Sequence, residues 1–264
     1  MVAVFQDALE CLLLAQPEQK CAAVFALHAR FDEEGLNLVK SKLIDDVVNP
    51  GRPEYPKLVS PRNVPRRNLS SLEGRIALVH AIAHIEFNAI NLALDAMYRF
   101  QDMPLQFYKD WMKVAYEEAQ HFKMLHARLH VLNSDYGSFD AHNGLWEMAI
   151  KTKHSVIARM ALVPRILEAR GLDVTPSMIV RLQNHSDLET VEILKIIFEQ
   201  EIGHVAIGSR WFNYACEQNG LESEEVFQGL LKEYMSGELR GPFELEARKK
   251  AGFSTAELEA LQNI

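Results

Sequence analysis

Apolar residues recur at helical spacing through the central part of the chain. Between residues 70 and 100 they are separated by three or four positions, as on a helix with one buried face. This apolar set consists of Val79, Ile82, Ala83, Ile90, Ala93 and Met97. Ser70 and Glu73 have the spacing of a capping box, so we expect a helix that begins there and runs to about Phe100.

A second helix is expected after a turn at residues 101–104. Pro104 suits the first turn of a helix because proline has no backbone N–H to satisfy there. Helical spacing of apolar residues then continues to about Leu132. The pattern over 70–132 therefore predicts a helical hairpin, followed by a crossover loop at residues 133–143.

The third helix is expected to begin near Gly144 and to be irregular. Pro164 should kink it, because proline removes a backbone hydrogen bond inside a helix. Residues 171–176, which begin with a glycine and end with a proline, predict an interruption. We expect the helix to resume over 177–184 in about the same direction.

The fourth helix is expected to begin at a cap at Ser186 or Asp187 and to end at about Gln218. Helical segments are predicted after it at 222–235 and 242–251. Ser254 and Glu257 then form another capping box.

Residues before the first hairpin predict helices at 2–15 and 18–30 and then an irregular arm at 49–68. The arm contains five prolines, which break helices and cannot donate in a strand ladder. It ends in the arginines Arg62, Arg66 and Arg67, which we interpret as a solvated surface cluster in preference to an anion-binding patch. The fold prediction is all-α.

The predicted domain organisation has three parts. Residues 1–69 form N-terminal helices and the proline-rich arm, residues 70–218 form a four-helix bundle, and residues 219–264 form a helical tail packed on the bundle.

Composition limits the functional classes. A net charge of −8 over 264 residues disfavours broad nucleic-acid binding, which usually needs a basic domain. Three cysteines without Cys-x-x-Cys spacing favour free thiols in a reducing compartment. The N-terminal segment carries acidic residues and no basic leader, and we found no long uncharged apolar stretch. We therefore expect a cytoplasmic protein without a membrane span.

Two Glu-x-x-His pairs lie within apolar stretches of the second and fourth predicted helices. They are Glu118 with His121 and Glu201 with His204. Residues three apart lie on the same face of a helix, so each carboxylate projects beside its imidazole. Burying an unpaired carboxylate is costly, so a positive group is expected opposite each pair.

A solitary glutamate precedes each pair on the preceding helix. Glu86 lies 32 residues before Glu118, and Glu168 lies 33 residues before Glu201. Glu86 and Glu118 are each about 14 residues from the turn, roughly 21 Å along their helices at about 1.5 Å per residue. The chain is therefore predicted to contain two copies of one helical hairpin, each supplying half of a dinuclear site.

Two other glutamates compete for these positions. Glu117 is one position round the helix from Glu118 and has no histidine three residues later. Glu147 lies 54 residues before Glu201, which does not match the interval in the first hairpin, so we prefer Glu168. The simpler alternative is a helical bundle in which buried glutamates and histidines neutralise one another without metal.

The residue set suits a pair of divalent metal ions. One glutamate from each of two helices and a Glu-x-x-His pair from each of the other two are the ligands of di-iron and di-manganese carboxylate bundles. Four carboxylates balance four positive charges, and imidazole suits first-row metals. We expect two Fe ions, or Fe/Mn or Mn/Mn, bound by Glu86, Glu118, His121, Glu168, Glu201 and His204. No catalytic residue is assigned beyond these ligands.

With these residues, the chain resembles the ferritin-like superfamily over about residues 70–218. The segments at 163–173 and 201–208 are more closely similar to a bacterial family of ferritin-like proteins known as a domain of unknown function. The resemblance implies a four-helix bundle, a di-iron or mixed iron–manganese centre and oxygen chemistry. Relatives in the superfamily include ferroxidases, rubrerythrins and a tRNA hydroxylase, and because one fold hosts many functions it implies no single substrate.

The leading functional hypothesis is an oxidoreductase that activates O2, either a hydroxylase or an oxidase of a small organic substrate. The arm and the tail favour it because they offer material for a substrate pocket and for docking an electron-donor protein or a second copy. An iron-handling ferroxidase or storage protein is the alternative, and a bundle with structural metals is the third. A nucleic-acid substrate is disfavoured by the acidic charge.

Overall fold

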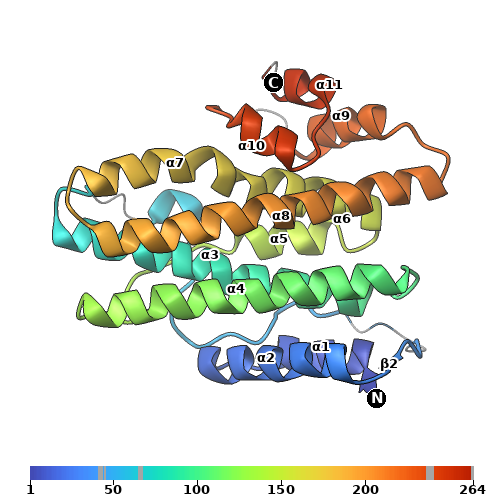
Figure 1. The fold of residues 1–264 in the computed structure, drawn as a ribbon, viewed down its shortest axis with the longest axis horizontal. Helices are drawn as coiled ribbons and strands as arrows, with labels where there is room; N and C mark the ends of the chain where they lie inside the picture. The colour runs from blue at the N-terminus through green and yellow to red at the C-terminus, as the bar shows by residue number, and fades with distance from the viewer. Residues whose placement is uncertain (41–43, 45, 65–67, 236–240, 263–264) are drawn as a thin grey trace. The chain divides into compact units, whose positions relative to one another are not determined.

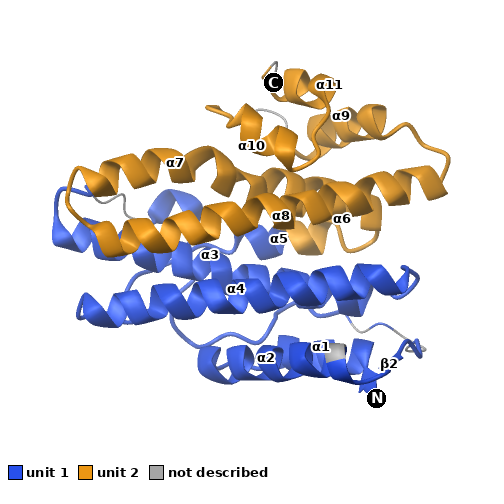
Figure 2. Cartoon of the chain, viewed as in Figure 1, with its two compact units in different colours: residues 1–147 blue, residues 148–264 orange. Residues whose placement is uncertain are grey.

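The computed structural model describes all residues except 41–43, 45, 65–67, 236–240 and 263–264. Helices dominate the chain, and the described residues contain very little extended structure, so the all-α class is confirmed. The chain forms two compact units, residues 1–147 and residues 148–264 (Figure 1, Figure 2). The boundary falls inside the short helix α5 (Gly144–Lys151). The three-part division of the chain stays a prediction.

The first unit is built on the predicted hairpin. Helices α3 (Leu72–Arg99) and α4 (Leu105–Val131) pack along one another, with bounds close to those expected (Figure 1). The helix cap differs from the prediction by one residue. Ser71, and not Ser70, is the N-cap, because its hydroxyl accepts the Gly74 N–H at 3.0 Å.

Two N-terminal helices cover the hairpin. Helix α1 (Val4–Leu13) packs on α3, and α2 (Pro17–Glu33) packs on α4. Strand β1 (Val2–Ala3) pairs in parallel with β2 (Leu36–Asn37), which the sequence pattern did not predict because both strands are two residues long.

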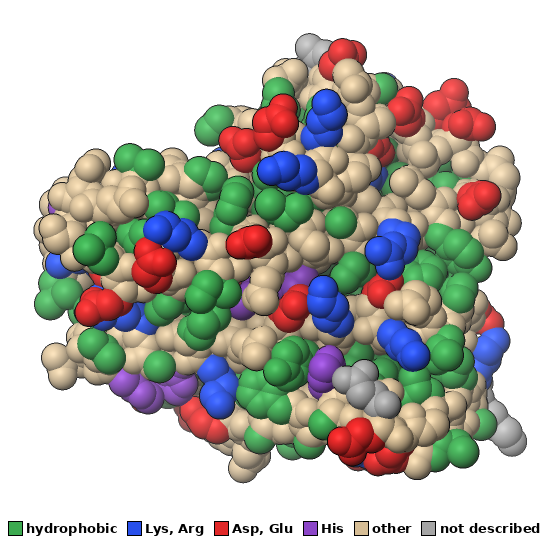
Figure 3. All heavy atoms as spheres, viewed as in Figure 1, with side chains coloured by type: hydrophobic (Ala, Val, Ile, Leu, Met, Phe, Trp, Pro, Cys, Tyr) green, Lys and Arg blue, Asp and Glu red, His purple; other side chains and the backbone are tan. Residues whose placement is uncertain are grey.

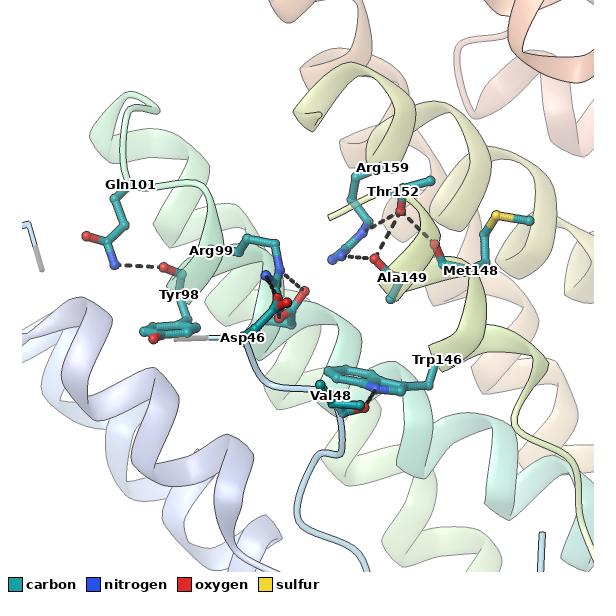
Figure 4. Close-up of polar contacts among 11 residues, drawn as sticks. Asp46, Val48, Tyr98, Arg99, Gln101, Trp146, Met148, Ala149, Thr152 and Arg159 are labelled. Carbon is teal, nitrogen blue, oxygen red and sulfur yellow. Dashed lines mark hydrogen bonds and ion pairs between the residues drawn. The ribbon is translucent and has the colours of Figure 1, made fainter. Parts of the chain in front are cut away.

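The proline-rich arm is irregular in its described part, apart from the 3₁₀ turn η1 (Pro61–Asn63). Leu58 lies beside Ala141, where the Val59 N–H donates to the Ala141 carbonyl oxygen at 2.8 Å. The Trp146 indole donates to the carbonyl oxygen of Val48 at 2.8 Å (Figure 4). These bonds fasten the arm to the crossover loop, and the residue just before the arm to α5. Arg62 lies on η1, whereas Arg66 and Arg67 lie outside the described residues.

Buried polar side chains of α3 contact the segments that precede it in the chain. The ammonium of Lys20 donates to the Leu12 carbonyl oxygen at 2.7 Å and to the side-chain oxygen of Asn91. Arg99 donates to both oxygens of Asp95, through Nε at 3.1 and 3.0 Å and through Nη2 at 2.7 Å, and its guanidinium also lies 3.5 Å from Asp46 (Figure 4). These contacts tie α2 and the segment before the arm to α3.

In the second unit the third predicted helix is divided into several pieces. Helix α6 (Val156–Leu162) continues into a π-helical segment, η2 (Val163–Glu168), and then into α7 (Ala169–Gln183). The predicted interruption at Gly171 is therefore wrong, because α7 runs unbroken through Gly171 and Pro176. The irregularity lies instead at Pro164. Because proline has no backbone N–H, the carbonyl oxygen that would accept from it can accept from the N–H of the next residue, which gives π-helical spacing.

Helix α8 (Leu188–Gln218) packs against α6, η2 and α7. Its N-cap is Asp187, one of the two predicted residues, and the carboxylate accepts the Thr190 N–H at 3.3 Å. Gly208 allows a close approach to η2, since a Cβ atom there would lie 2.5 Å from Cγ of Pro164.

The start of this unit is fixed by one arginine. The fully buried guanidinium of Arg159 donates to the Ala149 carbonyl oxygen at 2.5 Å and to the Thr152 hydroxyl at 3.0 Å (Figure 4). The arginine thus holds the turn between α5 and α6.

The tail contains α9 (Ser223–Tyr234), α10 (Leu245–Lys250) and α11 (Thr255–Gln262). The predicted capping box is confirmed, because the Glu257 N–H donates to the Ser254 hydroxyl at 3.2 Å and the Ser254 N–H donates to the Glu257 carboxylate at 2.9 Å. Glu257 also accepts a bond from buried Arg165 at 2.7 Å. Arg248 donates to Asp173 at 2.9 and 2.8 Å through its two oxygens, so two buried arginine–carboxylate pairs fasten the tail to η2 and α7.

Helix α3 is long and apolar enough, by length and composition alone, to cross a membrane. However, most of its apolar stretch is buried inside the structure. A buried core helix has this property, and we interpret α3 in this way.

The contact between Gly208 and Pro164 predicts a position-specific loss of stability. Gly208→Ala should lower the free energy of unfolding by about 1–3 kcal/mol, because the added methyl group overlaps a rigid proline ring. Gly203→Ala is the matched control five residues earlier on α8. Apart from the neighbouring backbone of α8, no atom of the described residues lies within 4 Å of its added Cβ, so it should be neutral or gain up to about 1 kcal/mol. Urea unfolding measures both changes, and equal effects would contradict the proposed contact.

Burial of Lys20 predicts a pH-dependent stability. Desolvation lowers the pKa of Lys20 from 10.5 to about 7, so the unfolded chain keeps this proton over a pH range in which the folded chain has lost it. The free energy of unfolding should therefore rise with pH between about 7 and 10.5, by at most about 1.4 kcal/mol per pH unit. Lys20→Met should remove this rise in chemical unfolding measured across that range. Lys109→Met, at an exposed position, should keep it; the same slope in both variants would refute the assignment.

Candidate metal centre

The first unit brings three of the predicted ligands together. Glu86 projects from α3, and Glu118 and His121 project from successive turns of α4. Nδ1 of His121 lies 3.1 Å from the Glu86 carboxylate and 3.2 Å from the Glu118 carboxylate. Their exposed fractions are 3%, 1% and 0%, so the group is shielded from water.

The local sequence accounts for this placement. Glu86 follows the apolar face of α3, and the helix places it at the level of α4 that carries Glu118, as the equal distances from the turn predicted. The neighbouring alanines Ala83, Ala115 and Ala119 are buried and small. They leave the inner faces of α3 and α4 close enough for the side chains to meet.

The electrostatics of the group favour binding of a cation. Burial and the nearby charge of Glu118 raise the pKa of Glu86 well above its ordinary value. Burial alone would lower the pKa of His121, but its hydrogen bonds to Glu118 and Glu86 outweigh burial and raise that pKa well above the usual value. The group therefore retains protons that a divalent cation would displace.

The alternative ligand in this unit faces elsewhere. Glu117 lies 3.7 Å from the ammonium of Lys113, one turn earlier on α4, and it is half-buried. The two histidines that precede Glu86 on α3, His80 and His84, belong to another network. His84 contacts the hydroxyl of Tyr136 at 2.8 Å, and burial lowers its pKa to about 4, so His84 is neutral.

The second unit carries the corresponding pair on α8. Nδ1 of His204 lies 3.6 Å from the Glu201 carboxylate, and both residues are buried. Glu168 is also buried and is the last residue of η2, which packs against α8. The rival Glu147 is exposed on α5. Each unit therefore presents a Glu-x-x-His pair from one helix and a buried glutamate from a neighbouring segment.

The donor atoms of the first unit fit a metal ion. One oxygen of Glu86, one of Glu118 and one nitrogen of His121 lie within 4.8 Å of one another. Two carboxylates and one imidazole suit a first-row divalent metal, such as iron or manganese. The buried glutamate–histidine cluster could therefore hold a metal ion.

The sequence interpretation missed a second group of metal-binding residue types. His126, His130 and Asp135 also place one donor atom each within 4.8 Å of one another. The signal was a His-x-x-x-His spacing at the end of a predicted helix. It carried no weight because the partner aspartate follows in a loop, whose path the sequence does not specify.

These observations define a mostly helical protein with a buried glutamate–histidine cluster that could hold a metal ion. A family model described as "Protein of unknown function (DUF455)" matches residues 13–259, so the chain belongs to the DUF455 family. The chain is also similar to a protein of Haemophilus influenzae (strain ATCC 51907 / DSM 11121 / KW20 / Rd) described as "Uncharacterized protein". The two are 41% identical over 271 residues, covering 98% of this chain and 94% of that protein. No solved structure matches the chain.

The two adjacent glutamates of α4 provide a matched test of the cluster. Glu118→Gln should weaken Mn²⁺ binding at least about tenfold, because it removes a charged donor from the buried group. Glu117→Gln should leave the affinity within about twofold, because that side chain faces Lys113. Titration of metal-free protein with Mn²⁺, followed by electron paramagnetic resonance, measures both affinities. A loss of the same size in both variants would exclude a specific role of Glu118.

Proposed function

We propose that the chain is a ferritin-like di-metal carboxylate protein, in which the two groups combine in one dinuclear centre. The ligands would be Glu86, Glu118, His121, Glu168, Glu201 and His204. The observation that carries the proposal is the buried contact of His121 with both Glu86 and Glu118. The matching pair on α8 and the nearly equal sequence intervals support it.

The fold proposed with this centre is a four-helix bundle of α3, α4, the α6–α7 segment and α8. Each unit supplies one hairpin, and the hairpin carries a glutamate on its first arm and a Glu-x-x-His pair on its second. The π-helical segment that ends at Glu168 supports a functional role, because such segments occur frequently at functional sites.

We further propose that the protein is an oxidoreductase that activates O2, most simply a hydroxylase or oxidase of a small organic substrate. Two iron ions, or an iron–manganese or manganese pair, would supply the electrons for reduction of O2. In this proposal the carboxylates of Glu86, Glu118, Glu168 and Glu201 and the imidazoles of His121 and His204 would hold the metals. His121, which shares a proton with Glu86 and Glu118, would release it as the metals bind.

The surroundings of the first group suit this chemistry because they exclude water. Glu86, Glu118 and His121 are almost fully buried, as are the alanines beside them, Ala83, Ala115 and Ala119. A dry site protects reactive oxygen chemistry from solvent.

The cellular setting follows from the same proposal. We propose a cytoplasmic protein with buried free thiols at Cys11, Cys21 and Cys216, which suits a reducing compartment. Catalytic turnover would need an electron-donor protein. Iron oxidation and storage, the alternative function, needs neither a substrate pocket nor the extensions outside the hairpins.

The deciding measurement is the metal content per chain of the purified protein. We expect close to two iron or manganese ions per chain, lost in a Glu118→Ala, Glu201→Ala double variant. Loaded anaerobically with Fe²⁺ and then mixed with O2, the wild type should consume O2 in a fixed ratio to bound iron. Circular dichroism would show that the variant keeps its helices.

Each other outcome points to a different conclusion. Many iron ions per chain in a shell-like oligomer would establish storage and refute the oxidoreductase. Two firmly bound metals without any O2 consumption would establish a structural centre. Zinc alone or no metal, unchanged by the substitutions and by iron loading, would refute the dinuclear centre.

A further inference from the structure

Two histidines lie one turn apart at the end of α4. His126 and His130 have ring centroids 4.4 Å apart, and they project from the same face of the helix. Figure 3 shows histidine side chains gathered on the surface beside this end of α4, next to acidic side chains. Paired imidazoles at this spacing are a common element of transition-metal sites on helices.

The end of α4 is shaped so that the chain turns back over these histidines. Asn133 adopts a left-handed conformation, with φ 56°, and its N–H donates to the His130 carbonyl oxygen at 3.0 Å. The N–H of Ser134 donates to the Leu129 carbonyl oxygen at 2.9 Å. Together these are the two hydrogen bonds of a Schellman motif, which fixes the direction of the chain after the helix.

This turn brings Asp135 onto both imidazoles. Nε2 of His126 lies 2.6 Å from Oδ1 of Asp135, and Nε2 of His130 lies 3.1 Å from the same oxygen. Two nitrogens and one carboxylate oxygen therefore converge on one point at the surface.

A second carboxylate lies on the far side of one imidazole. Oε1 of Glu18, at the start of α2, is 3.7 Å from Nδ1 of His126. Carboxylates are common near the outer nitrogen of a metal-binding histidine. Glu18 would lie beside Nδ1 of His126 if Nε2 bound a metal.

We propose that His126, His130 and Asp135 form a zinc site, separate from the buried group that contains Glu118. Zinc binds imidazole nitrogen and carboxylate oxygen at about 2.0–2.2 Å, so its ligand atoms are separated by roughly 3.3 Å in a tetrahedron. The present separations need only a small outward movement of Asp135, whose side chain is 67% exposed. Three protein ligands leave one tetrahedral position for water.

The ligand types favour zinc over the harder cations. Magnesium and calcium prefer oxygen ligands, whereas two imidazoles suit zinc and the neighbouring first-row metals. The site also has a definite structural task. It joins α4 to the loop at 133–143, which contacts α3 through Tyr136 and through the Gly137 N–H that donates to His80 at 2.9 Å. Bound zinc would therefore fasten this loop to α4.

The test is a zinc titration of the full-length, untagged, metal-free protein by calorimetry. The wild type should bind one more zinc ion per chain than His130→Ala, or bind it at least about tenfold more tightly. Asp135→Asn should have the same effect. Both substitutions are at exposed side chains, so they should leave the fold intact. His185→Ala, at an exposed position on the other unit, is the control and should bind zinc as the wild type does.

Two further measurements assign the ion to this site. Long-range ¹H–¹⁵N spectra of the imidazoles should show zinc on Nε2 of His126 and His130. Zinc should also slow amide hydrogen exchange at residues 133–138 in the wild type and not in His130→Ala. Equal zinc affinity in the wild type, His130→Ala and Asp135→Asn would overturn the proposal, as would zinc signals confined to other histidines. Because the imidazole signals are assigned to individual histidines, zinc bound at the buried group that contains Glu118 would be distinguished from zinc bound at His126 and His130.

Discussion

The hydrogen-bonded contact of His121 with Glu86 and Glu118 is the constraint on which the first unit depends. Two carboxylates inside a helical hairpin repel one another and lose their hydration, so the hairpin is stable only with a positive partner between them. The imidazole supplies that partner in the metal-free protein, and a divalent cation would supply it more completely. Residues around the group are therefore small, apolar and closely packed, which fixes the separation of α3 and α4.

The same principle recurs where the outer segments join the core helices. Buried basic side chains lie at each junction: Lys20 between α2 and α3, Arg165 beneath α11 and Arg248 beside α7. Arg165 is also surrounded by three phenylalanine rings, with centroids 4.4–4.7 Å from the guanidinium carbon. A buried ion pair often adds little net stability, but loss of one partner is costly because a charge is left buried. The two arginine–carboxylate pairs therefore specify where the tail docks more than they strengthen the fold.

The second unit places its irregularity where the chemistry is proposed. A π-helical turn is less stable than an α-helical turn, and it persists here because Pro164 cannot donate the regular bond and Gly208 on α8 leaves room for its ring. The segment ends at Glu168, so the irregular turn sets the direction of this carboxylate. Each residue of an α-helix is rotated by about 100° from the one before it. Without the extra residue of the π-helical turn, Glu168 would therefore lie on a different face of the helix.

The sequence by itself determined the elements and the buried group of the first unit. Helical periodicity, caps and the turn at Pro104 placed α3, α4 and α8 nearly to the residue, because these signals depend on local hydrogen bonding and on one buried face. The equal distances from the turn also placed Glu86 level with Glu118. Only the tertiary structure decided that α7 continues through Gly171, that Gly208 contacts Pro164 and that Asp135 returns to His126. Each of these depends on packing between segments distant in sequence, or on the path of a loop, and the local pattern carries no information about either.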